Sequence, residues 1–90
     1  MKRTTIEKKV YKANKELMYK RDGHRCRSCN SSENLTPHHV IFRSQLGPDD
    51  LENLICLCIN CHNAVHDRFL LIKSVDGAVK FTRLKNWRPQ

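Results

Sequence analysis

Apolar residues occur in short runs along this 90-residue chain, and polar turns separate the runs. Residues 1–12 carry Lys and Arg without clear apolar periodicity, so we expect a frayed basic arm or a loose first helix turn there. The good helix formers that follow predict a short helix from 13 to about 21, which ends at Asp22-Gly23. The pattern therefore predicts one helix before the first strand.

A strand, a long loop, a second strand and a helix are predicted for the middle of the chain. The run 35–41 indicates a strand, and Pro37 within it favours a position at the edge of a sheet. The polar loop 42–52 is longer than a tight hairpin needs, which leaves room for functional residues. A return strand at 53–57 and a short helix at 61–68 complete the pattern.

Two more strands are predicted at 69–74 and 79–84, with Asp76-Gly77 as the turn signal and a basic tail behind them. No apolar run approaches the roughly 20 residues of a membrane span. The charged N-terminus also lacks the apolar segment of a signal peptide. We therefore expect a soluble cytoplasmic protein without membrane contact.

The cysteines indicate a metal site. Cys26 and Cys29 form one C-x-x-C pair, and Cys58 and Cys61 repeat the spacing. Without an export signal, paired spacing favours metal thiolates over disulfides, and four thiolates suit a structural Zn²⁺ ion, which a domain this small needs for stability. Buried free thiols are the weaker alternative. Cys56 is left over and is interpreted as a small buried apolar residue of a strand.

Positive charge is concentrated at the two ends of the chain. The formal net charge is +8, from 17 Lys and Arg against 9 Asp and Glu. Residues 1–21 hold eight basic and two acidic side chains, and residues 73–90 hold five and one. Such ends suit a protein that grips a polyanion, although a merely soluble basic surface has the same composition.

Several further motifs lie in order between residues 21 and 68. They are His38-His39, Arg43-Ser44-Gln45, Leu51-Glu52-Asn53-Leu54 and Leu57-Cys58-x-x-Cys61-His62-x-x-x-His66. In this order the chain resembles the HNH endonuclease family, which has the ββα-metal or His-Me finger fold. The resemblance implies an α+β fold: a small zinc-stapled ββα-metal domain with an N-terminal helix and a C-terminal β-hairpin. We expect one domain over 1–90, comprising the arm 1–12, the helix and zinc-stapled core 13–68, and the hairpin and tail 69–90.

The resemblance also assigns roles to the polar residues of this region. His39 resembles the general base that activates water, and Asn53 the residue that ties down the loop and orients that base. His38 and His62 resemble ligands of a catalytic divalent metal. His66 matches a histidine that either completes the metal site or contacts phosphate, and both roles stay open. On this basis His39, Asn53 and His62 are the expected catalytic residues.

Elementary chemistry supports this division of roles. Adjacent residues on a strand point to opposite faces, so His38 and His39 are not equivalent ligands. Relatives often carry aspartate where this chain has His38, and imidazole shifts the metal preference away from Mg²⁺, so Mn²⁺, Mg²⁺, Ni²⁺ and Co²⁺ all remain candidates. The alternatives are a closed second zinc site that only stabilises the fold, and Asn53 as a simple strand cap.

The family resemblance makes DNA the expected partner. The side chains expected to contact it are Lys20, Arg21, Arg43, Gln45, Lys73 and Arg83. For Arg43 a solvated loop position is an equal alternative. We expect nicking or double-strand cleavage with little sequence specificity, in a bacterial or phage-infected cell, where packaging or restriction proteins are possible partners. The alternative function is a non-catalytic, zinc-stabilised module that binds nucleic acid through its basic ends.

Overall fold

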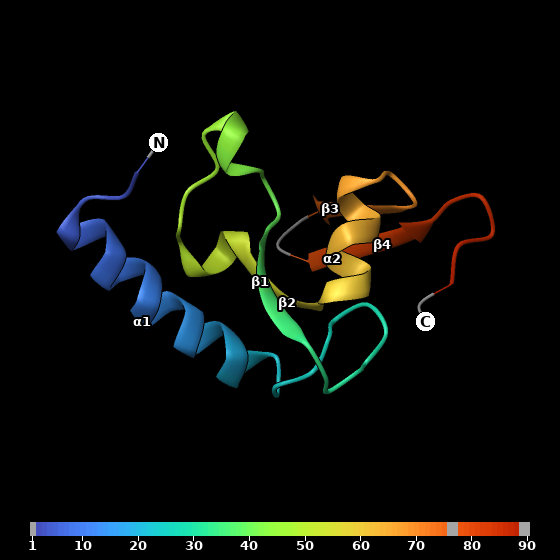
Figure 1. Cartoon of the computed structure of the whole chain (residues 1–90), viewed down its shortest axis with the longest axis horizontal. Coiled ribbons are helices and arrows are strands. Elements are labelled where there is room, and N and C mark those ends of the chain that lie inside the picture. The colour runs from blue at the N-terminus through green and yellow to red at the C-terminus, as the bar shows by residue number, and fades with distance from the viewer. Residues whose placement is uncertain (1, 76–77, 89–90) are drawn as a thin grey trace.

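The computed structural model describes residues 2–75 and 78–88, and it confirms the expected α+β fold with an N-terminal helix and a C-terminal hairpin (Figure 1). The elements are α1 (Thr5–Arg21), β1 (Leu35–His39), two short 3-10 turns (Arg43–Gln45 and Leu51–Asn53), β2 (Leu54–Cys58), α2 (Ile59–His66), β3 (Leu70–Val75) and β4 (Ala78–Arg83). The predicted turn at Asp76-Gly77 lies outside the described residues. Neither helix in the described ranges combines the length and apolar character required for a membrane span.

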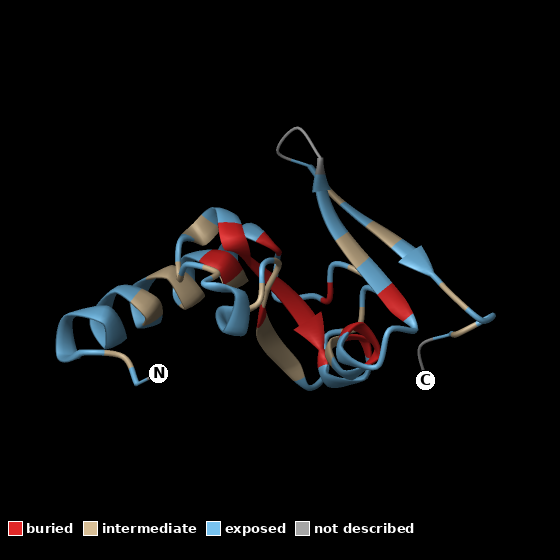
Figure 2. Ribbon diagram, turned by 90° about the horizontal axis from the view of Figure 1, so that it is seen from above, coloured by how far each residue is buried: buried red, intermediate tan, exposed pale blue. Residues whose placement is uncertain are grey.

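The strands form two separate antiparallel ribbons, β1 with β2 and β3 with β4. In Figure 1, α1 lies on one side of the first ribbon, and α2 with the second ribbon lies on the other. Figure 2 shows that the buried residues gather in and around β2, whereas most of α1 is exposed. The long axis of the molecule, 41 Å, reflects this row of elements.

β2 is buried at all five of its positions and divides the interior into two small cores. On the side of α1, Leu54 and Cys56 pack with Met18. On the side of α2 and β3, Ile55 and Leu57 pack in a second cluster whose other buried residues are Cys26, Cys58, Cys61, Ala64, Val65 and Leu70. A strand covered on both faces is expected to be a continuous apolar run, and the segment LICLC is one.

The first helix starts earlier than the sequence pattern suggested. α1 begins at Thr5, so residues 5–12 are helical and the frayed arm, one of the two expectations for this segment, is wrong there. The reason is a capping box: the Glu7 N–H donates to Thr4 Oγ1 at 3.2 Å, and the Thr4 N–H donates to Glu7 Oε1 at 2.9 Å. Thr4-x-x-Glu7 is a readable helix-start signal that apolar periodicity does not reveal.

Pro37 lies at a position of β1 where strand pairing does not require a backbone N–H donor. It lies opposite Cys56 in the ribbon. The Cys56 N–H donates to Asp22 Oδ2 at 3.0 Å, and the Cys56 carbonyl accepts from the Arg27 N–H at 2.9 Å. Because both backbone groups of Cys56 point away from β1, Pro37 occupies a non-hydrogen-bonded pair, which agrees with the predicted edge position.

Asp22 joins the end of α1 to β2 and to the loop that follows α1. Its side chain is fully buried, and it accepts hydrogen bonds from Arg21 at 2.8 Å, from Arg27 at 2.9 Å and from the Cys56 N–H. Burial by itself raises the pKa of this carboxyl, but the bonds from Arg21, Cys56 and Arg27 outweigh burial and lower the pKa. Asp22 therefore stays ionised at neutral pH and cross-links three segments.

Asp22→Ala should destabilise the chain, because the Cys56 N–H and two guanidinium groups lose a buried partner. We expect the free energy of unfolding of the zinc-loaded protein to fall by about 3 kcal/mol, measured by urea denaturation. Glu33→Ala is the control, since Glu33 is exposed, and its effect should stay within about 0.5 kcal/mol. Equal effects of the two substitutions would contradict this role of Asp22.

Candidate active site and metal centres

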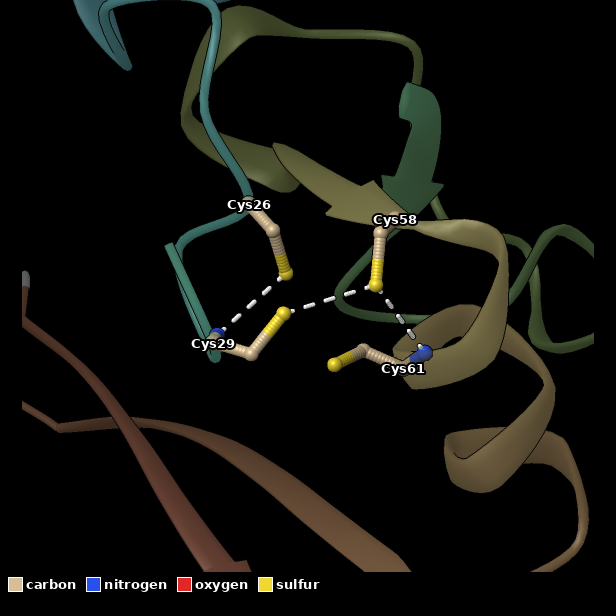
Figure 3. Close-up of side chains that lie close together, drawn as sticks. All are labelled: Cys26, Cys29, Cys58 and Cys61. Atoms are coloured by element: carbon tan, nitrogen blue, oxygen red, sulfur yellow. Dashed lines mark hydrogen bonds between the residues drawn. The ribbon is translucent and has the colours of Figure 1, made fainter. Parts of the chain in front are cut away.

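Four cysteines from separate parts of the chain meet at one point, and we call them the cysteine cluster (Figure 3). Cys26 and Cys29 come from the loop after α1, Cys58 ends β2, and Cys61 lies in the first turn of α2. One sulfur atom from each lies within 4.8 Å of the others, and Cys29 Sγ and Cys58 Sγ are 3.6 Å apart. Zinc–sulfur bonds of about 2.3 Å in a tetrahedron place sulfurs roughly 3.8 Å apart. The cluster could therefore hold a metal ion, and its donor set suits zinc.

Backbone N–H groups point at two of these sulfurs. The N–H groups of Ser28 and Cys29 donate to Cys26 Sγ, each at 3.4 Å, and the Cys61 N–H donates to Cys58 Sγ at 3.5 Å. Burial by itself raises the pKa of Cys26, but these and other backbone donors outweigh burial and lower that pKa. The backbone thus stabilises the thiolate of Cys26, the form that binds metal, whereas burial raises the pKa of Cys29 and of Cys61.

Cys56, the fifth cysteine, stands apart from the cysteine cluster. It is fully buried on the α1 side of β2 and packs with Met18 and Leu54. Burial, and then the nearby Asp22 carboxylate, raises the pKa of Cys56 to about 11. The interpretation of Cys56 as a small buried apolar residue is therefore confirmed.

Three histidines form a second group, the histidine cluster, which consists of His38, His62 and His66. His38 comes from β1, and His62 and His66 are one turn apart on α2. One ring nitrogen from each lies within 4.8 Å of the others. The cluster borders a surface pocket of about 290 Å³, whose other lining residues are His39, Phe42, Arg43 and Ser44.

His38 is the deepest member of the histidine cluster, with 1% of its surface exposed. Its Nε2 atom is buried and has no hydrogen-bond partner within the described residues. Burial, followed by the neighbouring His62 and His66, lowers the pKa of His38 to about 3, so the ring is neutral. A buried nitrogen without a partner is costly, and a divalent cation shared with two adjacent imidazoles would satisfy it.

Thr36 sets the tautomer of His62. Its hydroxyl donates to the Leu57 carbonyl at 2.9 Å, and His62 Nδ1 lies 2.9 Å from the same hydroxyl oxygen. Since the hydroxyl has one proton, already given to Leu57, the bond to His62 requires Nδ1–H as the donor. His62 Nε2 then carries a lone pair, which is the state a metal ligand needs.

His39 faces away from the histidine cluster, as expected for its position next to His38 on a strand. Its Nε2 lies 2.7 Å from Asp49 Oδ1, and its ring lies 5.8 Å from that of Tyr11 on α1. His39 is nevertheless one of the residues that line the same pocket. β1 therefore carries two adjacent imidazoles in different environments: His38 belongs to the histidine cluster, and His39 lies beside Asp49 and Tyr11.

Asn53 holds the loop between β1 and β2. Its side-chain oxygen accepts from the Ile41 N–H at 2.8 Å, and its amide donates to the carbonyls of Ile41 at 3.1 Å and Pro48 at 2.8 Å. The Val40 N–H donates to the Asn53 carbonyl at 2.9 Å. These bonds fix the chain directly after His39 and end β1 there, so the strand predicted to reach residue 41 is shorter.

The residues expected to contact DNA are not brought together at the pocket. Arg43 lines the pocket, and Gln45 lines an adjacent groove of about 480 Å³ that also includes His66. Arg21 instead donates to Asp22 and to the carbonyls of Leu51 and Leu54, which gives it a packing role. The remaining three, Lys20, Lys73 and Arg83, are exposed on α1, β3 and β4.

Two polar residues of this region were not anticipated. Thr36 precedes His38 by two positions on the same strand face, and this period-two spacing was a usable signal. Asp49 forms an ion pair with Arg3, which is 46 positions away in the sequence, and no local sequence pattern predicts that pair.

The site is a ββα segment with two clusters of side chains that could each hold a metal ion, and this arrangement identifies the class of domain. Within the chain, residues 26–68 match the model of the HNH endonuclease family. The match confirms the resemblance based on the motifs, and the matched segment contains both clusters together with His39 and Asn53. Comparisons with curated proteins and with solved structures found no match.

Cys61→Ser should remove the bound zinc and destabilise the protein, because a structural zinc site contributes directly to folding. Cys56→Ala is the matched control: Cys56 is equally buried but lies outside the cysteine cluster. We expect about one zinc ion per chain in the wild type and in Cys56→Ala, and far less in Cys61→Ser. Zinc content and thermal unfolding report the result. Full zinc content in Cys61→Ser would exclude Cys61 as a ligand.

Proposed function

We propose that this protein is a metal-dependent HNH endonuclease that hydrolyses DNA phosphodiester bonds with little sequence specificity. One observation carries the proposal: the histidine cluster and His39 border the same open pocket. A site that only stabilised the fold would enclose its metal, whereas a catalytic site keeps positions for substrate. Three histidine ligands leave such positions.

The histidine cluster is the proposed holder of the catalytic divalent metal. His38, His62 and His66 supply nitrogen ligands only, a donor set that favours Mn²⁺, Ni²⁺ or Co²⁺ over Mg²⁺. When bound, the ion supplies Lewis-acid stabilisation of the negative charge on the phosphate and the leaving oxygen. Thr36 supports this role, since it keeps the Nε2 lone pair of His62 available.

His39 is the proposed general base. It lines the pocket but is outside the histidine cluster, so its ring is not needed as a ligand. A neutral imidazole takes a proton from water near neutral pH, and such catalysis contributes about 10²–10⁴-fold. Asn53 supports it by fixing the backbone that follows His39.

The basic ends of the chain are the proposed contacts to the DNA backbone. Eight basic side chains lie within residues 1–21, and α1 displays most of them on an exposed helix. Arg43 lines the pocket and could contact the phosphate that is cleaved. Contacts to phosphates position DNA without reading its sequence, which accounts for the low specificity proposed.

Plasmid cleavage tests the proposal. We expect zinc-loaded protein to nick supercoiled plasmid only when Mn²⁺, Ni²⁺, Co²⁺ or Mg²⁺ is added, and His39→Ala to lower the rate by about 10² or more with unchanged DNA affinity. His24→Asn is the control, because His24 lies outside the pocket and asparagine tolerates its φ of 55°. Binding without cleavage under every metal would favour the non-catalytic module.

Thr36→Val should weaken the second metal site but leave the zinc site intact. The substitution removes the hydroxyl that fixes the tautomer of His62, so we expect the affinity for added Co²⁺ to fall about 10–100-fold. Isothermal titration calorimetry on zinc-loaded protein measures this affinity. Thr82→Val, on the exposed face of β4, should bind Co²⁺ as the wild type does. Equal affinities in both variants would remove Thr36 from the site.

A further inference from the structure

Asp49 is bound on both sides by charged or ionisable groups. Its carboxylate accepts from Arg3 Nε at 2.6 Å and from Arg3 Nη2 at 2.9 Å, and its Oδ1 lies 2.7 Å from His39 Nε2. The side chains of Arg3, Asp49 and His39 are 17%, 15% and 12% exposed. This two-pronged ion pair is therefore largely sheltered, which separates it from ordinary surface salt bridges.

Residues of α1 and the segment just before it hold this arrangement in place. The Arg3 guanidinium lies 3.7 Å from the centre of the Tyr11 ring, and that ring also contacts His39. Asn14 donates to the Asp49 carbonyl at 2.9 Å. Arg3, Tyr11 and Asn14 all lie before residue 26, outside the segment that matches the HNH family model.

The carboxylate determines which nitrogen of His39 carries the proton. Asp49 is a hydrogen-bond acceptor only, because the bond from Arg3, with that from His39, holds the pKa of its carboxyl far below the usual range. The proton in the 2.7 Å contact must then belong to His39 Nε2. In the neutral ring, His39 Nδ1 is then left with the lone pair.

We propose that Asp49 is a positioning residue that holds His39 with Nδ1 as the proton-accepting nitrogen, and that Arg3 keeps Asp49 in that position. The inference rests on the proposed function in one respect, the role of His39 as base.

The water oxygen bonds to phosphorus as the bond to the leaving oxygen breaks, and the water proton passes to Nδ1. The leaving oxygen takes a proton from solvent. Asp49 then faces a positively charged imidazole, while Arg3 offsets the repulsion between Asp49 and DNA phosphate.

Asp49→Asn tests the proposal, with Asp50→Asn as the matched control from the same loop, since Asp50 is exposed. An asparagine amide can donate to Nε2 and so favour the wrong tautomer. We expect kcat to fall about 10²-fold or more, with KM within about twofold and the protein still folded at the assay temperature. Asp50→Asn should retain the wild-type kcat.

Long-range ¹H–¹⁵N NMR spectra of zinc-loaded protein without a second metal report the tautomer of His39. A purely structural role of Asp49 would leave this tautomer unchanged. We expect His39 to show an Nε2–H tautomer in the wild type and in Asp50→Asn, and a mixed or inverted population in Asp49→Asn. An unchanged tautomer and unchanged kcat in Asp49→Asn would overturn the proposal. If wild-type protein cleaves no DNA, the proposed function fails, and the spectra still decide whether Asp49 sets the tautomer.

Arg3→Gln tests the proposal in a second way, without a change in the loop that carries Asp49. Loss of the guanidinium frees Asp49 to move, so we expect kcat to fall about tenfold and the His39 tautomers to become mixed. Arg25→Gln, at an exposed position outside both basic ends of the chain, is the control and should match the wild type. Wild-type kcat and tautomer in Arg3→Gln would remove Arg3 from the proposal.

Discussion

The burial of β2 on both faces is the constraint on which the rest of this structure depends. One edge of the strand pairs with β1, and the other is bonded at Cys56 by the Asp22 carboxylate and the Arg27 backbone. Its two faces separate the two hydrophobic cores. With neither face nor edge free, β2 has one possible register. Asn53 immediately before it and Cys58 at its end are therefore placed as accurately as the strand itself.

Both clusters draw side chains from α2, the helix that follows this strand. The cysteine cluster joins a loop to the junction of β2 and α2, so a bound metal would tie α1, the strand and α2 together. The histidine cluster combines β1 with the later turns of α2. Since α2 supplies Cys61 to one cluster and His62 and His66 to the other, the geometry of the proposed active site depends on the integrity of the cysteine cluster.

The N-terminal part of the chain contacts the proposed active site. Tyr11 and Asn14 of α1 contact His39 and Asp49, Arg3 just before the helix binds Asp49, and Met18 near the C-terminal end of α1 packs against β2. A helix outside the HNH segment thus touches the residue proposed as base. The position of α1 would then influence catalysis as well as DNA binding.

Much of this protein could be predicted from its sequence, because short-range patterns report local chemistry. Repeated C-x-x-C spacing indicated the cysteine cluster, strand alternation separated His38 from His39, and the apolar run of β2 indicated a buried strand. The tertiary structure alone determined the partners of isolated polar residues: the bonds of Asp22, the intramolecular role of Arg21 and the pairing of Arg3 with Asp49. A pair 46 positions apart leaves no periodicity in the sequence, since only the packing of α1 against the loop brings it together.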